Sequence, residues 1–162
     1  MKRDSIRRLT HMAVLTAVAL TIFAAEAQLP SLVPIPGVKL GLANIVTVYA
    51  VFALGPGPAA MILLARVLLG SLFSGGMTIF YSLTGGVCCY LVMLVMRKLV
   101  TRRQIWVCSV LGAMAHNIGQ IAAAAALTRP PGIAAYLPVL LLSAIVTGLF
   151  TGLCAQFLTD RL

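Results

Sequence analysis

Apolar residues run along this chain in six long stretches, separated by short segments rich in proline, glycine or charge. The stretches are residues 11–29, 39–54, 57–73, 77–96, 104–127 and 135–158. Such runs predict membrane-spanning helices, since a helix needs about 20 apolar residues to cross the hydrocarbon core. The second and third runs are short. We expect an all-α integral membrane protein, with residues 1–162 forming one bundle of about six transmembrane helices.

The composition excludes a soluble fold. Hydrophobic residues make up 61% of the chain and charged residues 9%, and the mean hydropathy is +1.07. A soluble domain carries about 25% charged residues. Six spans would use the whole length, so no separate catalytic domain is expected.

The net charge of +9 raises the question of nucleic-acid binding, but the basic residues lie at the ends of the apolar runs. Lys and Arg accumulate in cytoplasmic loops of membrane proteins. With the N-terminus inside, nine basic residues fall on the inner face and only Lys39 and Arg129 on the outer. The inner residues are Lys2, Arg3, Arg7, Arg8, Arg97, Lys98, Arg102, Arg103 and Arg161. We expect a multi-pass protein of the bacterial cytoplasmic membrane with both termini cytoplasmic and no nucleic-acid partner.

The first run has two possible interpretations, because a basic start followed by the triplet Ala25-Glu26-Ala27 imitates a secretory signal peptide with its cleavage site. The run is nearly long enough to span the bilayer, and five remaining spans would upset the charge pattern. We therefore interpret it as an uncleaved first span.

Cysteines give no sign of a metal site. Cys88, Cys89, Cys108 and Cys154 all fall in predicted spans and form no CxxC pair, so we interpret them as small packing residues.

Two charged side chains, Glu26 and Arg66, are expected at membrane depth, where a charge must face protein or water. Pairing them is the simplest arrangement. Such a pair could merely fix helix packing. Alternatively, Arg66 presents its planar donors to an anionic ligand while Glu26 orients it.

Another polar group lies in the fifth run, where His116 and Gln120 share one helix face and Asn117 lies about 100° round from it. Interhelical hydrogen bonding would explain these residues. Contact with a ligand is the alternative, because three polar groups within five positions exceed what packing usually needs.

The segment after the first span is rich in Pro and Gly from Pro30 to Gly37 and then leads through Lys39 to Asn44. It could be a pre-shaped cap over an outward-facing cavity, with Lys39 adding a cation at its mouth, or an ordinary connection. On the first helix, Ala13 and Ala17 form a small-xxx-small face that permits close contact with another helix, either of this chain or of a partner protein.

Several of these residues together resemble one membrane family, known both as Gx transporter and as heptaprenyl diphosphate synthase component I. The matching features are Glu26 before the Pro-rich loop, residues 36–44 (PGVKLGLAN), Arg66, Ser82-Leu83 with Gly85-Gly86, and Gly112 leading to the HNIGQ run of residues 116–120. The family is in turn similar to the S components of energy-coupling factor (ECF) transporters. That resemblance implies six helices, a capping first loop and an alanine-rich first helix that meets a coupling subunit, a feature that Ala13 and Ala17 match.

A catalytic prenyl synthase is not expected, because such enzymes hold magnesium with aspartate-rich motifs and this chain has three acidic residues, Asp4, Glu26 and Asp160. There is also no GxxxxGK[ST] loop, so ATP-driven uptake would need separate ATPase and coupling subunits.

Three hypotheses follow. The first is a substrate-binding subunit that captures a small or amphiphilic anion from the outer side with Glu26, Lys39, Asn44, Arg66, His116, Asn117 and Gln120. The second is a membrane component of quinone- or flavin-linked electron transfer, or of isoprenoid quinone synthesis, whose polar pocket holds a quinone head group or a prenyl diphosphate. The sequence offers neither a haem-ligand pair nor an iron–sulfur pattern, so redox chemistry would need a bound quinone or flavin or a partner. The third is a scaffold that anchors a partner complex.

Overall fold

The computed structural model describes residues 2–29, 39–74, 76–128 and 132–161, and helices joined by short turns make up this part of the chain. The α-helices are α1 (Lys2–Glu26), α2 (Asn44–Ala53), α3 (Pro56–Ser74), α4 (Gly76–Leu99), α5 (Ile105–Thr128) and α6 (Leu137–Asp160). Two 3₁₀ turns, Arg102–Gln104 and Ile133–Tyr136, precede α5 and α6. The predicted all-helical architecture is confirmed.

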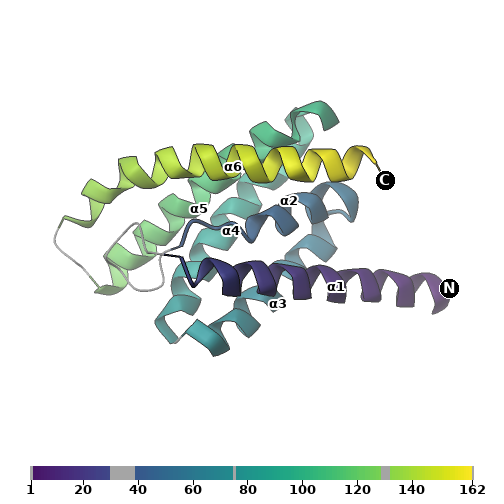
Figure 1. Cartoon of the computed structure of the whole chain (residues 1–162), viewed down its shortest axis with the longest axis horizontal. Helices are drawn as coiled ribbons and strands as arrows, with labels where there is room; N and C mark the ends of the chain where they lie inside the picture. The colour runs from purple at the N-terminus through teal and green to yellow at the C-terminus, as the bar shows by residue number, and fades with distance from the viewer. Residues whose placement is uncertain (1, 30–38, 75, 129–131, 162) are drawn as a thin grey trace.

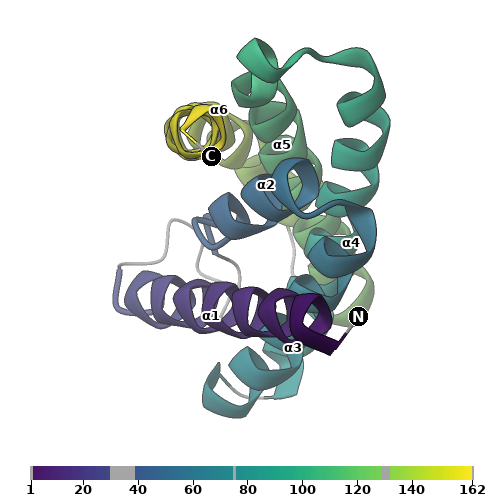
Figure 2. The same cartoon turned by 90° about the vertical axis from the view of Figure 1, so that its right-hand side faces the viewer.

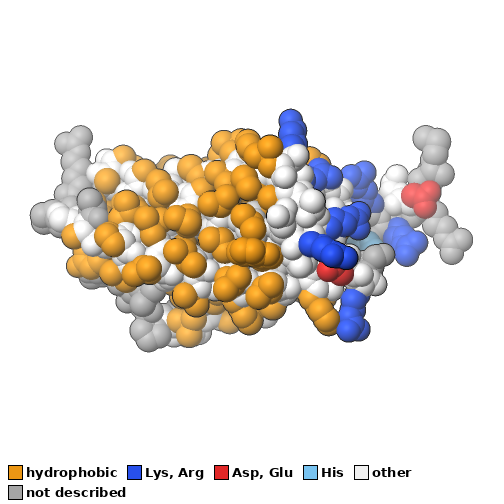
Figure 3. All heavy atoms as spheres, turned by 90° about the horizontal axis from the view of Figure 1, so that it is seen from above, with side chains coloured by type: hydrophobic (Ala, Val, Ile, Leu, Met, Phe, Trp, Pro, Cys, Tyr) orange, Lys and Arg blue, Asp and Glu red, His pale blue; other side chains and the backbone are white. Residues whose placement is uncertain are grey.

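Four of the helices are long and apolar enough to cross a bilayer: Asp4–Glu26, Thr78–Leu99, Arg102–Thr128 and Leu137–Asp160. Their outward faces carry large apolar side chains, such as Leu91, Val146 and Phe150, which are more than half exposed. Figure 3 shows hydrophobic side chains covering most of the visible surface, with Lys and Arg gathered at one end. Such a surface suits contact with lipid chains, so the protein is a helical membrane protein.

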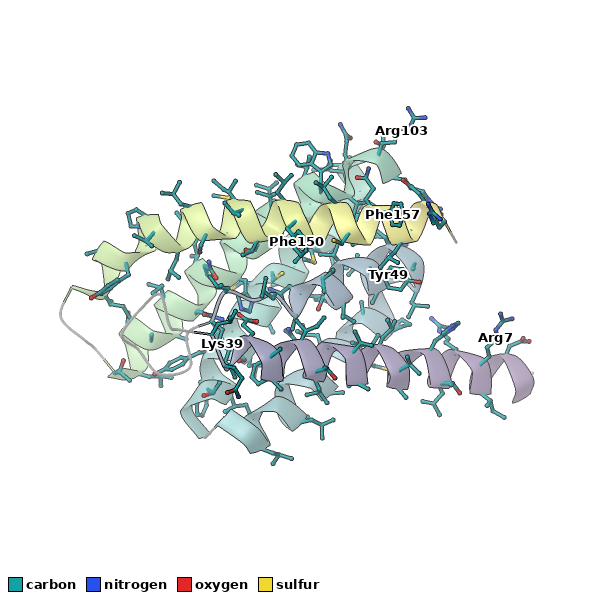
Figure 4. The ribbon with its side chains drawn as sticks, in the orientation of Figure 1. Arg7, Lys39, Tyr49, Arg103, Phe150 and Phe157 are labelled. Carbon is teal, nitrogen blue, oxygen red and sulfur yellow. The ribbon has the colours of Figure 1, made fainter. Side chains whose placement is uncertain are left out.

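The basic end is also the end that holds both termini, as Figures 1 and 3 show together. The start of α1, the end of α4, the start of α5 and the end of α6 all lie toward this end. Figure 4 places Arg7 and Arg103 at this end and Lys39 far from them, near the end of α1. Basic residues that the sequence assigned to opposite sides of the membrane, such as Arg7 and Lys39, therefore lie at opposite ends of the bundle.

Helix α2 occupies the middle of the bundle, and it contacts each of the other five α-helices. Figure 2 shows it surrounded by α1, α4, α5 and α6. Its side chains Val46, Val48, Ala50 and Val51 belong to the main buried cluster. A helix of 10 residues rises only about 15 Å, roughly half of the hydrocarbon core. The bundle therefore has a short central helix that is buried by its neighbours.

The second predicted span is wrong at its start, because residues 39–43 are not helical and α2 begins at Asn44. Gly41 has φ = 80°, a left-handed conformation that an α-helix does not contain. The turn before α2 also binds the first amides of the helix, since the N–H groups of Asn44 and Ile45 donate to the carbonyls of Gly41 and Leu42. Hydropathy alone could not reveal this break, because the residues around it are apolar.

Helix α1 is longer than the apolar run 11–29 at its start, since it extends back to Lys2. Hydropathy shows only the part of a helix that lies in the apolar core of the membrane. Arg and Lys are good helix formers, so the helix can continue beyond that part into water.

Helix α5 packs closely on both α4 and α6, because glycines remove side chains at the contacts. A Cβ on Gly119 would come within 3.0 Å of the Gly85 Cα, and one on Gly152 within 2.5 Å of the Trp106 Cα. Small residues allow such approach between membrane helices. A hydrogen bond of 3.0 Å between the Ser109 and Thr151 hydroxyls also joins α5 to α6.

By contrast, α1 lies at the side of the bundle, where it contacts only α3 and α2 among the α-helices of the described chain. Ala13 and Ala17 are exposed on its outward face. That exposure leaves the face free for another helix, and contact with a partner stays a prediction.

Candidate functional site

Side chains from five parts of the chain converge on one small cavity at the end of α1. Its volume is about 10 Å³, room for roughly one water molecule. It is lined by Phe23 and Glu26 of α1, Lys39 and Gly41 before α2, Arg66 and Val67 of α3, Ser82 of α4, and His116 and Gln120 of α5. The predicted site residues Glu26, Lys39, Arg66, His116 and Gln120 thus lie around a single space.

Glu26 holds the non-helical segment before α2 in place. Its Oε1 accepts a hydrogen bond of 2.6 Å from the Gly41 N–H, and its Oε2 accepts one of 3.0 Å from the Leu42 N–H. Irregular backbone inside a membrane protein must find such partners, because lipid chains cannot bind its amides. Two oxygens that both accept suit an ionised carboxylate. Glu26 is therefore a structural clamp as well as a charge at the cavity.

The direct Glu26–Arg66 ion pair that the sequence suggested does not form among the described residues. Arg66 instead donates from Nη2 to the Asn44 Oδ1, over 3.3 Å. Both oxygens of Glu26 are already engaged by the turn at residues 41–42, which brings the backbone between α1 and α2 to the carboxylate. Arg66 and Glu26 still line the same cavity, and both are buried.

The three polar side chains of α5, His116, Asn117 and Gln120, form hydrogen bonds on two different sides of the helix. The Gln120 Nε2 donates to the His116 Nε2, and the Gln120 Oε1 accepts from the Lys39 backbone N–H at 3.1 Å. Asn117 points away from the cavity and donates from Nδ2 to the Leu140 carbonyl of α6, over 2.7 Å. Interhelical bonding therefore accounts for the Asn117 amide nitrogen, whereas His116 and Gln120 belong to the cavity wall.

Four buried nitrogen atoms around this site have no hydrogen-bond partner within the described structure. They are Lys39 Nζ, Asn44 Nδ2, Arg66 Nε and His116 Nδ1. A buried polar group without a partner costs about 1–3 kcal/mol, and native proteins rarely leave several in one place. Three of these atoms can only donate, which makes the site short of acceptors.

Lys39 is held by its neighbours in an unusual way. Its Nζ lies 3.4 Å from the centroid of the Phe23 ring, a cation–π contact, while its backbone is bound to Gln120. Next to it, a Cβ on Gly41 would come within 2.8 Å of Asn44 Nδ2 and 3.0 Å of the His116 ring. The segment before α2 therefore lies tightly against the polar side chains.

Sequence reasoning assigned no site function to Phe23 or Ser82, and it cited Gly85 only as part of a family motif. Gly85 matters because a Cβ there would come within 2.8 Å of the Gln120 Cγ and the His116 carbonyl. Phe23 gave no signal among the many apolar residues of its run, while the Gly85-Gly86 pair in a helix was a usable sign of close approach. The Pro-rich cap predicted for residues 30–37 lies outside the described residues.

The site offers little to a divalent cation. No group of three or more His, Cys, Asp and Glu side chains that could hold a metal occurs in the part of the chain that the structure describes. The four cysteines are free, and Cys89 and Cys108 are buried. Glu26 is the one acid among the residues that line the cavity, beside the two cations Lys39 and Arg66.

These features define a class: a small helical membrane protein with a buried, donor-rich polar site. The family model described as heptaprenyl diphosphate synthase component I matches residues 15–158, and the chain belongs to that family. No curated protein and no solved structure matches the chain.

Proposed function

We propose that this protein is a membrane subunit that captures a small or amphiphilic anion from the side of the membrane opposite its termini, in the manner of an ECF transporter S component. The observation that carries the proposal is a group of unpartnered donors: Arg66 Nε and Lys39 Nζ, on residues that line the cavity, and Asn44 Nδ2. Asn44 does not line the cavity itself but is hydrogen-bonded to Arg66 beside it. A ligand with acceptor oxygens would supply the missing partners. Since the cavity of about 10 Å³ is too small for such a ligand, binding requires the wall at residues 39–43 to move.

The first test is to purify the protein in mild detergent and to identify bound small molecules by native mass spectrometry. We expect an anion that binds at least about tenfold more weakly to Arg66→Ala, because a charge-assisted hydrogen bond contributes about 1.5–3 kcal/mol. The matched control is Arg97→Ala, which removes an exposed arginine at the other end of the bundle. Equal binding by all three proteins would exclude the site as the place of capture.

The description of the family favours a second candidate, a non-catalytic membrane component of heptaprenyl diphosphate synthesis that works with a separate synthase subunit. In that case the protein should copurify with a soluble prenyl synthase and raise its activity or change its product length in a membrane. A chain that captures an anion but leaves such an enzyme unaffected would count against this candidate. A bound quinone or flavin in the mass spectrum would favour the electron-transfer variant instead.

We also propose that both termini are cytoplasmic in the bacterial cell membrane, because the described basic side chains gather at the terminal end. A fluorescent protein fused after Leu162 should then be bright, since green fluorescent protein does not mature in an oxidising periplasm after unfolded export. Alkaline phosphatase activity from the same fusion point would contradict this orientation.

Uptake driven by ATP would further require ATPase and coupling subunits, for which the exposed Ala13 and Ala17 face of α1 is a candidate contact.

A further inference from the structure

We infer that the ligand group bound at this cavity is a monoanion, and specifically a carboxylate, rather than a diphosphate. The inference rests on the proposed function and narrows it to one class of ligand. It follows from three properties of the site: the balance of buried charge, the number of unpartnered donors and the small size of the cavity.

The buried charges at the cavity do not cancel. Two cations, Lys39 and Arg66, and one carboxylate, Glu26, line the cavity, and they leave one net positive charge. Charge that is buried without compensation is costly, so a site evolves toward neutrality when its ligand is bound. One negative charge on the ligand would neutralise the site. A diphosphate carries two to three negative charges and would leave an excess of buried anion.

Magnesium usually relieves that excess when proteins bind diphosphates, and this site lacks the means to hold it. The described residues contain no cluster of metal-ligating side chains. Both oxygens of Glu26, the only acid at the cavity, already accept backbone N–H groups of residues 41 and 42. Releasing them to bind a cation would leave two buried amides without partners.

The donors fit a carboxylate in number. The unpartnered donors are Arg66 Nε, Asn44 Nδ2, Lys39 Nζ and His116 Nδ1. His116 Nδ1 donates, because the Gln120 amide nitrogen can only donate and the His116 Nε2 that it contacts must accept. A carboxylate has two oxygens with about four acceptor positions, so it can satisfy all four. The six or seven oxygens of a diphosphate would find too few donors here. The first turn of α2 adds none, because the N–H groups of Asn44 and Ile45 are bound to the preceding turn.

The small size of the cavity also favours a carboxylate over a diphosphate. The closed cavity of about 10 Å³ must expand for any ligand, and the expansion separates residues 39–43 from Glu26 or Gln120. A carboxylate group requires less movement than a diphosphate, since it is planar and much smaller than two linked phosphate groups. Each further hydrogen bond broken at residues 39–43 would reduce the affinity.

The experiment compares two amphiphiles with the same number of carbon atoms, decanoate and geranyl diphosphate, the latter with and without Mg²⁺. Their dissociation constants for the full-length protein in lipid nanodiscs are measured by isothermal titration calorimetry. Arg66→Ala and Arg97→Ala are titrated in parallel, so that partition into the bilayer is separated from binding at the site. We expect decanoate to bind at least about tenfold more tightly than geranyl diphosphate, and Arg66→Ala alone to lose that binding.

Two results would overturn the inference, and they are distinguishable. If geranyl diphosphate binds as tightly as decanoate or more tightly, and Arg66→Ala loses it, the monoanion is wrong while anion capture at this site stands. If neither compound shows binding that depends on Arg66, the proposed anion-capture function falls together with its ligand class.

Discussion

Replacing Glu26 by Gln is expected to destabilise the protein by about 3 kcal/mol or more, the largest stability effect we predict for a single substitution in the site. The side chain keeps nearly the same shape, but it loses the negative charge that compensates Lys39 and Arg66. Removing one member of a buried charged group typically costs about 3–5 kcal/mol, because the other charges remain buried without a partner. The amide also has one acceptor oxygen in place of two, so either the Gly41 or the Leu42 N–H loses its bond.

Equilibrium unfolding in mild detergent measures this loss, and hydrogen exchange locates it. The amides of Gly41 and Leu42 should exchange much faster in Glu26→Gln than in the unchanged protein, while those in the middle of α5 and α6 should change little. The matched control is Asp4→Asn, which neutralises an exposed acid on the same helix and should shift stability by less than about 0.5 kcal/mol. Equal stability of the two variants would show that the Glu26 carboxylate does not hold the segment at residues 41–42 in place.

The parts of this fold that followed from the sequence are those governed by the lipid. Long apolar runs indicated the helices, and the position of basic residues indicated the end that carries the termini, because both properties are set by transfer between water and hydrocarbon. The polar residues Glu26, Arg66, His116 and Gln120 also converged as expected, since each had to avoid lipid. These inferences required no knowledge of neighbouring helices.

What could not be predicted depends on partners far away in the chain. Whether Glu26 binds Arg66 or a backbone turn is decided by where residues 41–42 lie, and hydropathy carries no information about that position. The same holds for Asn117, whose amide nitrogen is bound by the Leu140 carbonyl on α6. The break before α2 had one local sign, Gly41, yet a lone glycine between apolar residues is also compatible with a continuous helix.

Replacing Asn44 by Asp is expected to abolish anion binding, with a dissociation constant raised at least about a hundredfold, while the protein without ligand becomes more stable. The substitution changes one amide nitrogen to oxygen next to Arg66, whose Nη2 already donates to Asn44 at 3.3 Å. A charge-assisted pair would replace a neutral hydrogen bond, and the unpartnered Nδ2 would disappear. The new carboxylate at position 44 would cancel the net positive charge of the site. It would also repel a ligand anion, which in the unchanged protein can accept a hydrogen bond from the amide nitrogen at this position.

Asn117→Asp is the matched control, because it makes the same change at the other buried asparagine of this group. There the Nδ2 donates to the Leu140 carbonyl, so a carboxylate would face a carbonyl oxygen and lower stability. We therefore expect opposite signs: Asn44→Asp raises the unfolding midpoint and loses the anion, whereas Asn117→Asp lowers the midpoint and, where it folds, retains the anion. If Asn44→Asp were to destabilise the protein and still bind the anion as before, the one net positive charge at the cavity could not be what attracts the ligand. The sign of the stability change thus tests the charge balance independently of the ligand, since it is measured on the empty protein.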